Sequence, residues 1–359
     1  MKNLLIAVAC AAFVTATVAA QRGEGGGGRG GEAPAVAPSG PAYPAWAYAI
    51  TPPPPPGTPR PPAPPEDTSV HHIAGTTRAF TVAQIADLRG PADWFPEDHP
   101  AMPSIVAVGR QPAVRSCSYC HYPNGKGRSS NGGVAGLPVS YILQTLNDFK
   151  NGLRKPGDPR KVNVNQMIAF AKNMTPEEMQ AAAEYFSSTP WTQWIRVVEA
   201  KMIPKTEAEG SIFFKEKGGG MEPIGMRVIE TPEDDEQTEP LRNPRSGFIA
   251  YVPPGAIKKG EALVTTGGNG KTIACTNCHG ADLRGNGPVP GIAGRSPSYL
   301  ARQMYDIQTG ARHGEWSELM KPVVAKLMNE DFVNIVAYVS SRPMPPAPGS
   351  KVQQTALAR

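Results

Sequence analysis

Apolar residues recur every three or four positions in two separate parts of the chain. Three segments place their apolar side chains on one face of a helix: 140–152 (SYILQTLNDFKNG), 177–186 (EEMQAAAEYF) and 331–339 (DFVNIVAYV). Acidic residues stand at the start of the last two segments, where they complement the positive end of a helix. The pattern predicts a mostly α-helical protein with two helical units, over residues 69–190 and 256–342.

The pattern changes between these two units. Residues 191–255 contain three runs rich in branched and aromatic residues, WTQWIRVVEAKMIP, GMRVIET and GFIAYVP, bounded by Gly, Pro and an acidic loop. Such runs are typical of short strands. We expect a small β-containing insert, which serves either as structural filler or as a docking surface for a partner.

The first twenty residues have the pattern of a cleavable export signal. MKNLLIAVACAAFVTATVAA holds one lysine, an apolar run and then small residues, with Gln21 next. We expect cleavage near Ala20 and a periplasmic location. The apolar run is too short for a membrane span, and no later stretch approaches the roughly 20 apolar residues that a span needs.

Two further segments have a composition that cannot build a core. Residues 21–68 are rich in Gly and then in Pro, and residues 343–359 form a second Pro-rich segment. We expect a disordered spacer and a flexible tail, neither with catalytic content. Net charge is +5, and basic residues interleave with acidic ones, which argues against nucleic acid as a partner.

Two short motifs carry the candidate chemistry. The chain has five cysteines, and removal of Cys10 with the export signal leaves four, all in the motifs CSYCH and CTNCH. The motif residues are Cys117, Cys120 and His121, and Cys275, Cys278 and His279.

A structural zinc site, a redox or disulfide dithiol, and covalent haem can each use such cysteines. Zinc bound by four thiolates, or a disulfide within each pair, gives the adjacent histidines no role. Covalent haem uses all three residues, because the thiols bond to porphyrin vinyl groups and the imidazole binds the iron. Two motifs behind an export signal predict two haem c groups, with a colourless zinc or disulfide protein as the alternative.

The sequence around the motifs is duplicated. At a shift of 158 residues, VAGLPVSYILQTLNDFKNGLR aligns without gaps with IAGRSPSYLARQMYDIQTGAR. After Arg154 the first copy has five extra residues, so that Met167 then aligns with Met320. A thioether is a known axial partner of histidine on haem iron, and we predict these two methionines as distal ligands. Met174 and Met328 are interpreted as residues that fill gaps in a core.

CSYCH with Met167, CTNCH with Met320 and the shared AGxxxSY…D…GxR segment resemble tandem two-haem class I cytochromes c, close to the cytochrome c4 type. The resemblance implies that each unit is a small bundle of helices around one haem, with its first and last helices crossing. It also implies a carrier of single electrons rather than an enzyme, which works between respiratory or dehydrogenase partners and can dock to a membrane-bound complex. The alternatives are a two-haem peroxidase or thiosulfate-oxidising cytochrome, and the cytochrome subunit of a periplasmic dehydrogenase.

Some positions depart from this family pattern. Pro290 matches the proline whose carbonyl accepts a hydrogen bond from the proximal imidazole, whereas the first copy has Gly132. Gly260 matches the small residue at the helix crossing, whereas the first copy has Met102, so we expect a less close crossing there. The repeated arginines, Arg154 and Arg312, are interpreted as solvated helix-end residues, with a haem propionate as the alternative partner.

Overall fold

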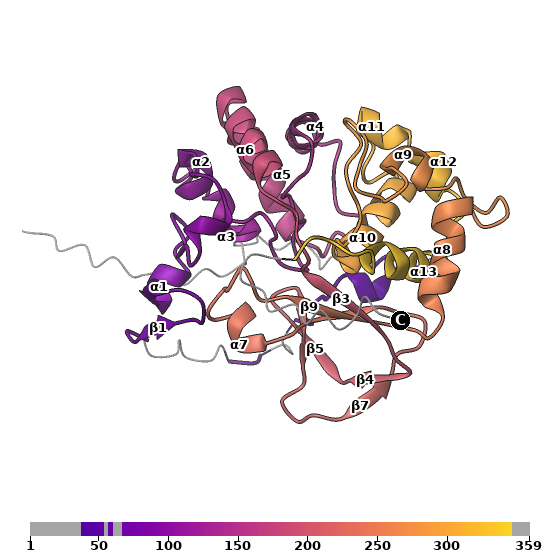
Figure 1. Ribbon diagram of the computed structural model, residues 1–359, viewed down its shortest axis with the longest axis horizontal. Coiled ribbons are helices and arrows are strands. Elements are labelled where there is room, and N and C mark those ends of the chain that lie inside the picture. Colours follow the sequence, from indigo (N-terminus) through magenta and orange to yellow (C-terminus); the bar gives the residue numbers. More distant parts are fainter. Residues whose placement is uncertain (1–36, 54–56, 60–66, 347–359) are drawn as a thin grey trace, which may run out of the picture.

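The computed structural model describes residues 37–53, 57–59 and 67–346. Two groups of helices lie side by side, and the strands of the middle segment lie along one flank of both (Figure 1). None of the helices in the described residues is both long and apolar enough to span a membrane.

The first group of helices is built around α4 and α6. Its helices are α2 (Ser104–Ala107), α3 (Cys117–His121), α4 (Val139–Lys150), α5 (Asn163–Asn173) and α6 (Pro176–Ser188). Ile142 and Leu146 of α4 and Phe186 of α6 belong to one buried cluster. The Thr175 hydroxyl accepts from the Glu178 N–H while the Glu178 carboxylate accepts from the Thr175 N–H, so α6 begins with a complete capping box.

The second group is organised by α13, whose residues are almost all buried. Its helices are α8 (Ala256–Thr266), α9 (Thr276–His279), α10 (Pro297–Gln308), α11 (Glu315–Glu318), α12 (Lys321–Val324) and α13 (Asn329–Ser340). At Gly260 an added Cβ would lie 1.9 Å from the Asn334 carbonyl oxygen, so α8 and α13 cross as closely as predicted. In the first unit, Met102 precedes α2, which is a single turn, and offers no comparable crossing.

The three runs expected to be strands all contribute strands. A three-stranded sheet has the order β3-β9-β8, from β3 (Ile195–Glu199), β9 (Phe248–Val252) and β8 (Ile229–Pro232). β3 runs parallel to β9, and β8 runs antiparallel to it. Two antiparallel pairs extend from the sheet, followed by one short helix: β5 (Thr206–Glu209) with β6 (Ile212–Lys215), β4 (Met202–Pro204) with β7 (Met221–Pro223), and α7 (Asp235–Thr238).

The expected spacer contains a segment that joins the core. Trp46 and Tyr48, in and beside η1 (Ala45–Ala47), are buried in the core of the second unit. The Trp46 indole donates to the Asn329 side chain at 2.7 Å. The Pro-rich composition hid the run AYPAWAYAI, which has enough apolar surface to pack, so the prediction for this part of residues 21–68 was wrong. The expected signal and residues 347–359 of the expected tail lie outside the described residues.

Residues 70–98 form a small cluster of their own, although they were expected to belong to the first helical unit. They contain β1 (Val70–His72), β2 (Ala79–Thr81), α1 (Val82–Ile85) and η2 (Pro96–Asp98). Trp94 and Phe95 are buried there with Leu241 of the insert, and the Trp94 indole donates to the Leu241 carbonyl at 2.8 Å. The core of the first unit begins instead near Met102.

Candidate functional site

The CSYCH motif forms a short helix at the wall of a cavity. One turn of α3 places Cys117 and Cys120, three positions apart, on the same face. Neither forms a disulfide within the described residues. Burial raises the pKa of the Cys117 thiol to about 12 and also raises the pKa of Cys120. Since a reactive redox dithiol needs a lowered thiol pKa, this environment argues against that alternative.

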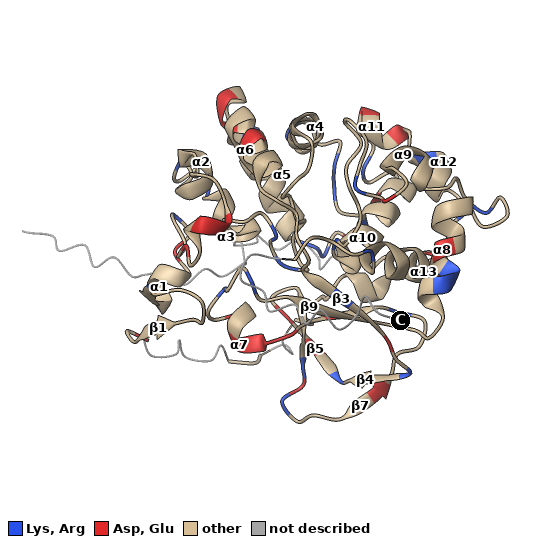
Figure 2. Ribbon diagram, in the orientation of Figure 1, with Lys and Arg blue, Asp and Glu red and all other residues tan. Residues whose placement is uncertain are grey.

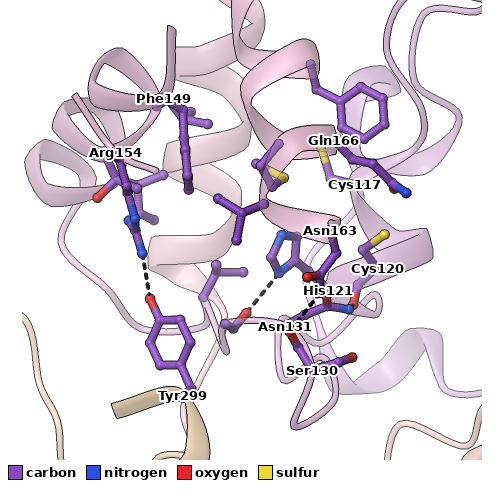
Figure 3. Close-up of a pocket in the computed structure, with 18 of the residues that line it drawn as sticks. Cys117, Cys120, His121, Ser130, Asn131, Phe149, Arg154, Asn163, Gln166 and Tyr299 are labelled. Atoms are coloured by element: carbon purple, nitrogen blue, oxygen red, sulfur yellow. Dashed lines mark hydrogen bonds between the residues drawn. The ribbon is translucent and has the colours of Figure 1, made fainter. Parts of the chain in front are cut away.

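His121 is held in one orientation by the backbone. Its Nδ1 lies 2.9 Å from the Gly132 carbonyl oxygen, which can only accept, so Nδ1 carries the hydrogen (Figure 3). Burial lowers the pKa of the imidazole and favours the neutral ring. The lone pair of Nε2 is therefore free for a metal, in the arrangement typical of histidine ligands. Gly132 is the residue that the 158-residue shift predicts for this role.

The cavity has an apolar lining that suits a porphyrin. Its volume is about 1440 Å³, counting its open mouth. Ile142, Leu146 and Phe149 contribute apolar walls, while both motif cysteines, His121 and Met167 line the same space. The residues present thus fit a haem bonded at Cys117 and Cys120.

Met167 lies one turn into α5 and is partly buried. The structure therefore brings it to the cavity that His121 lines, as the sequence predicts. Met174 is 5% exposed and packs in the first core, as expected of a core residue. Met328 does not pack in a core, contrary to the prediction. It is 38% exposed, and its N–H donates to Asp331 at the start of α13. The backbone of Met328 has the capping role there, and its side chain stays at the surface.

The second motif repeats the local geometry of the first. Cys275 caps α9, and burial raises the pKa of its thiol to about 11, whereas Cys278 is exposed. His279 is buried, and its Nδ1 lies 2.8 Å from the Pro290 carbonyl oxygen. Met320, the residue before α12, is partly buried against the second core. Pro290 thus has the role expected of it.

The two units meet along duplicated segments. The Lys155 N–H donates to the Ala311 carbonyl at 2.8 Å, and the His313 N–H donates to the Leu153 carbonyl at 2.9 Å. Each of these residues is related to its counterpart by the 158-residue shift. The contact is therefore reciprocal, like the interface of a twofold dimer.

Repeated side chains reinforce this contact. The Arg154 guanidinium donates to the Tyr299 hydroxyl at 3.0 Å, and Arg312 donates to the Tyr141 hydroxyl at 3.1 Å. Both arginines are buried, at 6% and 8% exposure, so the expectation of solvated helix ends was wrong. Their burial follows from the packing of one unit on the other. As a result Tyr299 and three other residues of α10 line the first cavity.

The insert holds the loop that follows the first motif, a role that sequence reasoning missed. The Arg242 guanidinium lies 4.4 Å from the ring centroid of Tyr119, inside CSYCH, and 5.3 Å from that of Tyr122. The Asn124 amide donates to the Pro244 carbonyl at 3.0 Å, and Arg128 forms an ion pair with Glu239. The only sequence signal was the aromatic residue between the two cysteines, which CTNCH lacks.

Arg242→Ala should lower the free energy of unfolding by about 1–2 kcal/mol, because it removes a charged hydrogen bond to the Tyr119 carbonyl and two ring contacts. Denaturant unfolding would measure this. Arg196→Ala is the control, since that arginine of the insert is 60% exposed and pairs only with surface Glu233. Equal losses of unfolding free energy in Arg242→Ala and Arg196→Ala would contradict the inference that Arg242 holds the loop after the first motif.

Charges of both signs are distributed over the helical groups and the strands, as Figure 2 shows. Within the described residues, no group of three His, Cys, Asp or Glu side chains is placed to share a metal ion.

Comparison with known proteins relates the segment that contains the first motif to a known family. The family model for cytochrome c matches residues 106–190. Cytochrome c4 of Azotobacter vinelandii is 24% identical over 240 residues, which cover 65% of this chain and 87% of that protein. Cytochrome c-554(548) of Halomonas halodenitrificans is 37% identical over 76 residues, 21% of this chain and 92% of that protein. The thiosulfate dehydrogenase electron acceptor of Stutzerimonas stutzeri is 34% identical over 89 residues, 24% of this chain and 40% of that protein.

Proposed function

Because the chain belongs to the cytochrome c family, we propose that it is a periplasmic two-haem cytochrome that passes single electrons between respiratory or dehydrogenase proteins. Its helical part has a cytochrome c-like fold, and its cofactors are two covalently bound haem c groups. Haem c supplies a one-electron couple between ferrous and ferric iron. The observation that carries the proposal is the duplicated arrangement of two cysteines and a histidine whose Nδ1 donates to a carbonyl eleven residues later.

The motif residues divide into three roles. Cys117, Cys120, Cys275 and Cys278 anchor the porphyrins through thioether bonds. His121 and His279 bind iron from the proximal side, with their ring orientation fixed by backbone carbonyls. Met167 and Met320 would supply thioether ligands to the iron, which would favour the ferrous state and a relatively high potential. Iron held by both a histidine and a methionine would leave no open position for a substrate.

The reciprocal contact between the units supports transfer of electrons inside the chain. Residues of α10 from the second unit form part of the wall of the first cavity. The two cytochrome c domains therefore work as one body, with haem in each. We place these domains in tandem, on either side of the insert at residues 191–255, and the first core near residues 102–190.

Replacing the methionines one at a time tests the ligand assignment. Met167→Ala and Met320→Ala should each abolish the weak methionine-to-iron absorption band at one haem and lower the potential of that haem, because the thioether raises the potential. Visible spectroscopy with potentiometric titration measures both effects. Met174→Leu is the matched control, since Met174 also lines the first cavity and should leave both bands intact. Unchanged methionine-to-iron bands in both Met167→Ala and Met320→Ala would refute the assignment of these methionines as ligands.

The partner that the comparisons favour is a periplasmic dehydrogenase. One relative is an electron acceptor of thiosulfate dehydrogenase, and a related role here would make the chain the acceptor rather than the dehydrogenase. Purified protein should then be reduced by such an enzyme and show no turnover of peroxide or thiosulfate alone. Turnover of either compound without a partner would favour the enzymatic alternatives instead.

The docking alternative is best tested by a deletion within the insert that keeps the clamp, which is the set of contacts of Arg242 with Tyr119 and Tyr122. Removing residues 205–245 would also remove this clamp. Shortening only the β5–β6 pair, residues 206–215, leaves the clamp intact. An unchanged rate of reduction by the partner would favour a structural role for this part of the insert, and a selective loss would favour docking.

A further inference from the structure

Lys161 is a buried cation at the first cavity. It belongs to the stretch KPGDPRKV, residues 155–162, which joins α4 to α5. Its side chain lines the cavity and is only 2% exposed. Its Nζ has no hydrogen-bond partner among the described residues. Since a buried ammonium is unfavourable unless it is paired, the charged form of this side chain requires an anion.

The nearby polypeptide does not provide that anion. Asp158 is an acidic residue whose charge attracts Lys161, but its carboxylate accepts from Arg160 at 2.7 Å and from the Tyr43 hydroxyl at 2.5 Å. Burial, together with the like charge of Arg302, lowers the pKa of Lys161 well below its usual value. The charged form therefore needs a negative group that reaches it through the cavity.

The two buried arginines that line the cavity are already engaged. Arg154 donates to Tyr299 and to the Gln303 side chain at 2.7 Å. Arg302 donates to two backbone carbonyls, at 2.6 and 2.9 Å. Among the described residues that line this space, Lys161 is thus the buried cation with free donors.

The amino end of α5 adds positive potential at the same place. This helix of eleven residues begins at Asn163, directly after Lys161 and Val162, and Val162 gives it no side-chain cap. Asn163 and Val164 also line the cavity, and Asn163 is fixed by a hydrogen bond of 2.9 Å to the Ser130 carbonyl (Figure 3). A helix amino terminus favours a negative group.

We propose that Lys161, assisted by the amino end of α5, binds a propionate carboxylate of the haem attached at Cys117 and Cys120. The proposal rests on the function proposed above, because it needs haem in the first cavity. It assigns a role to the five extra residues of the first copy. They lengthen the segment between α4 and Met167, and this segment places Lys161 at the cofactor.

The second copy has the opposite charge in this interval. Between Arg312 and Met320 it reads HGEWSEL, with two glutamates and no lysine. Positive charge near haem stabilises the ferrous form, which carries one positive charge less than the ferric form. We therefore expect the first haem to have the higher potential, and Lys161 to be one cause of the difference.

Lys161→Met in the full two-haem protein tests this. At a fixed electrode potential, the ratio of ferrous to ferric first haem should fall about tenfold, which corresponds to about 59 mV for one electron. Spectroelectrochemical titration resolves the two haems, and the haem affected in Met167→Ala identifies the first. Lys161→Arg should retain most of the original potential. Lys172→Met, on the exposed side of α5, is the control for loss of a lysine on the same helix.

The outcomes separate this inference from the proposed function. Propionate binding is supported if Lys161→Met lowers the reduction potential of the first haem alone and Lys161→Arg retains most of the original potential. An unchanged first potential, or equal shifts at both haems, overturns it while leaving two-haem electron transfer intact. Wild-type protein without haem at the first motif would instead refute the proposed function. If Lys161→Met does not assemble, Lys161→Gln removes the same charge and keeps a polar side chain, with the same readout.

Discussion

Replacing Cys117 and Cys120 together by alanine should halve the haem covalently bound to each chain. Without the two thiols no thioether can form, and His121 with Met167 gives only reversible contacts to the metal. The loss also leaves the first cavity and its apolar walls without a ligand. Unfilled apolar space of this kind destabilises the surrounding core, so the first unit should lose its cooperative unfolding transition. Haem absorbance per chain and the mass of the denatured protein measure the effect.

The matched variant is Cys275→Ala with Cys278→Ala, which should remove the other haem and leave the first. The sum of the two spectra then gives the spectrum of the unmodified protein. Two haems retained in either double variant would contradict the attachment sites. A protein that binds zinc in place of haem would contradict the cofactor as well, and it would be colourless from the start.

Much of the helical part could be predicted because its signals are local or repeated. Apolar periodicity placed α4, α6 and α13, and Thr175 with Glu178 marks the start of α6 by a reciprocal cap that the sequence shows directly. The family resemblance predicted the Pro290 carbonyl as the partner of His279, and the duplication carried this role to Gly132 and His121, because equivalent loops of two copies fold alike.

Other features depend on contacts between distant segments, which periodicity does not reveal. Arg154 and Arg312 look like solvated residues at helix ends, and they become buried only because the two units pack on each other. Arg242 contacts Tyr119 across more than a hundred residues of chain. Trp46 lies in a Pro-rich stretch whose average composition conceals a short apolar run. In each case tertiary packing overrides the local signal.

The second large effect is expected at the crossing of α8 and α13. Gly260→Ala should lower the free energy of unfolding by about 3 kcal/mol, although alanine in a helix is usually favoured over glycine by about 1 kcal/mol. An added Cβ would lie 1.9 Å from the Asn334 carbonyl oxygen and 2.8 Å from the Tyr338 Cβ. The nearest atom belongs to the backbone of a buried helix and cannot rotate away, so the two helices must separate.

Denaturant unfolding, followed at the absorbance of each haem, shows where the loss occurs. The absorbance of the second haem should change at a lower denaturant concentration than that of the first, because α8 and α13 belong to its unit. Gly218→Ala is the control, since a Cβ there meets nothing within 4 Å. A Gly260→Ala protein as stable as the unmodified chain would mean that the crossing can relax at little cost. The steric argument for glycine at this position would then fail.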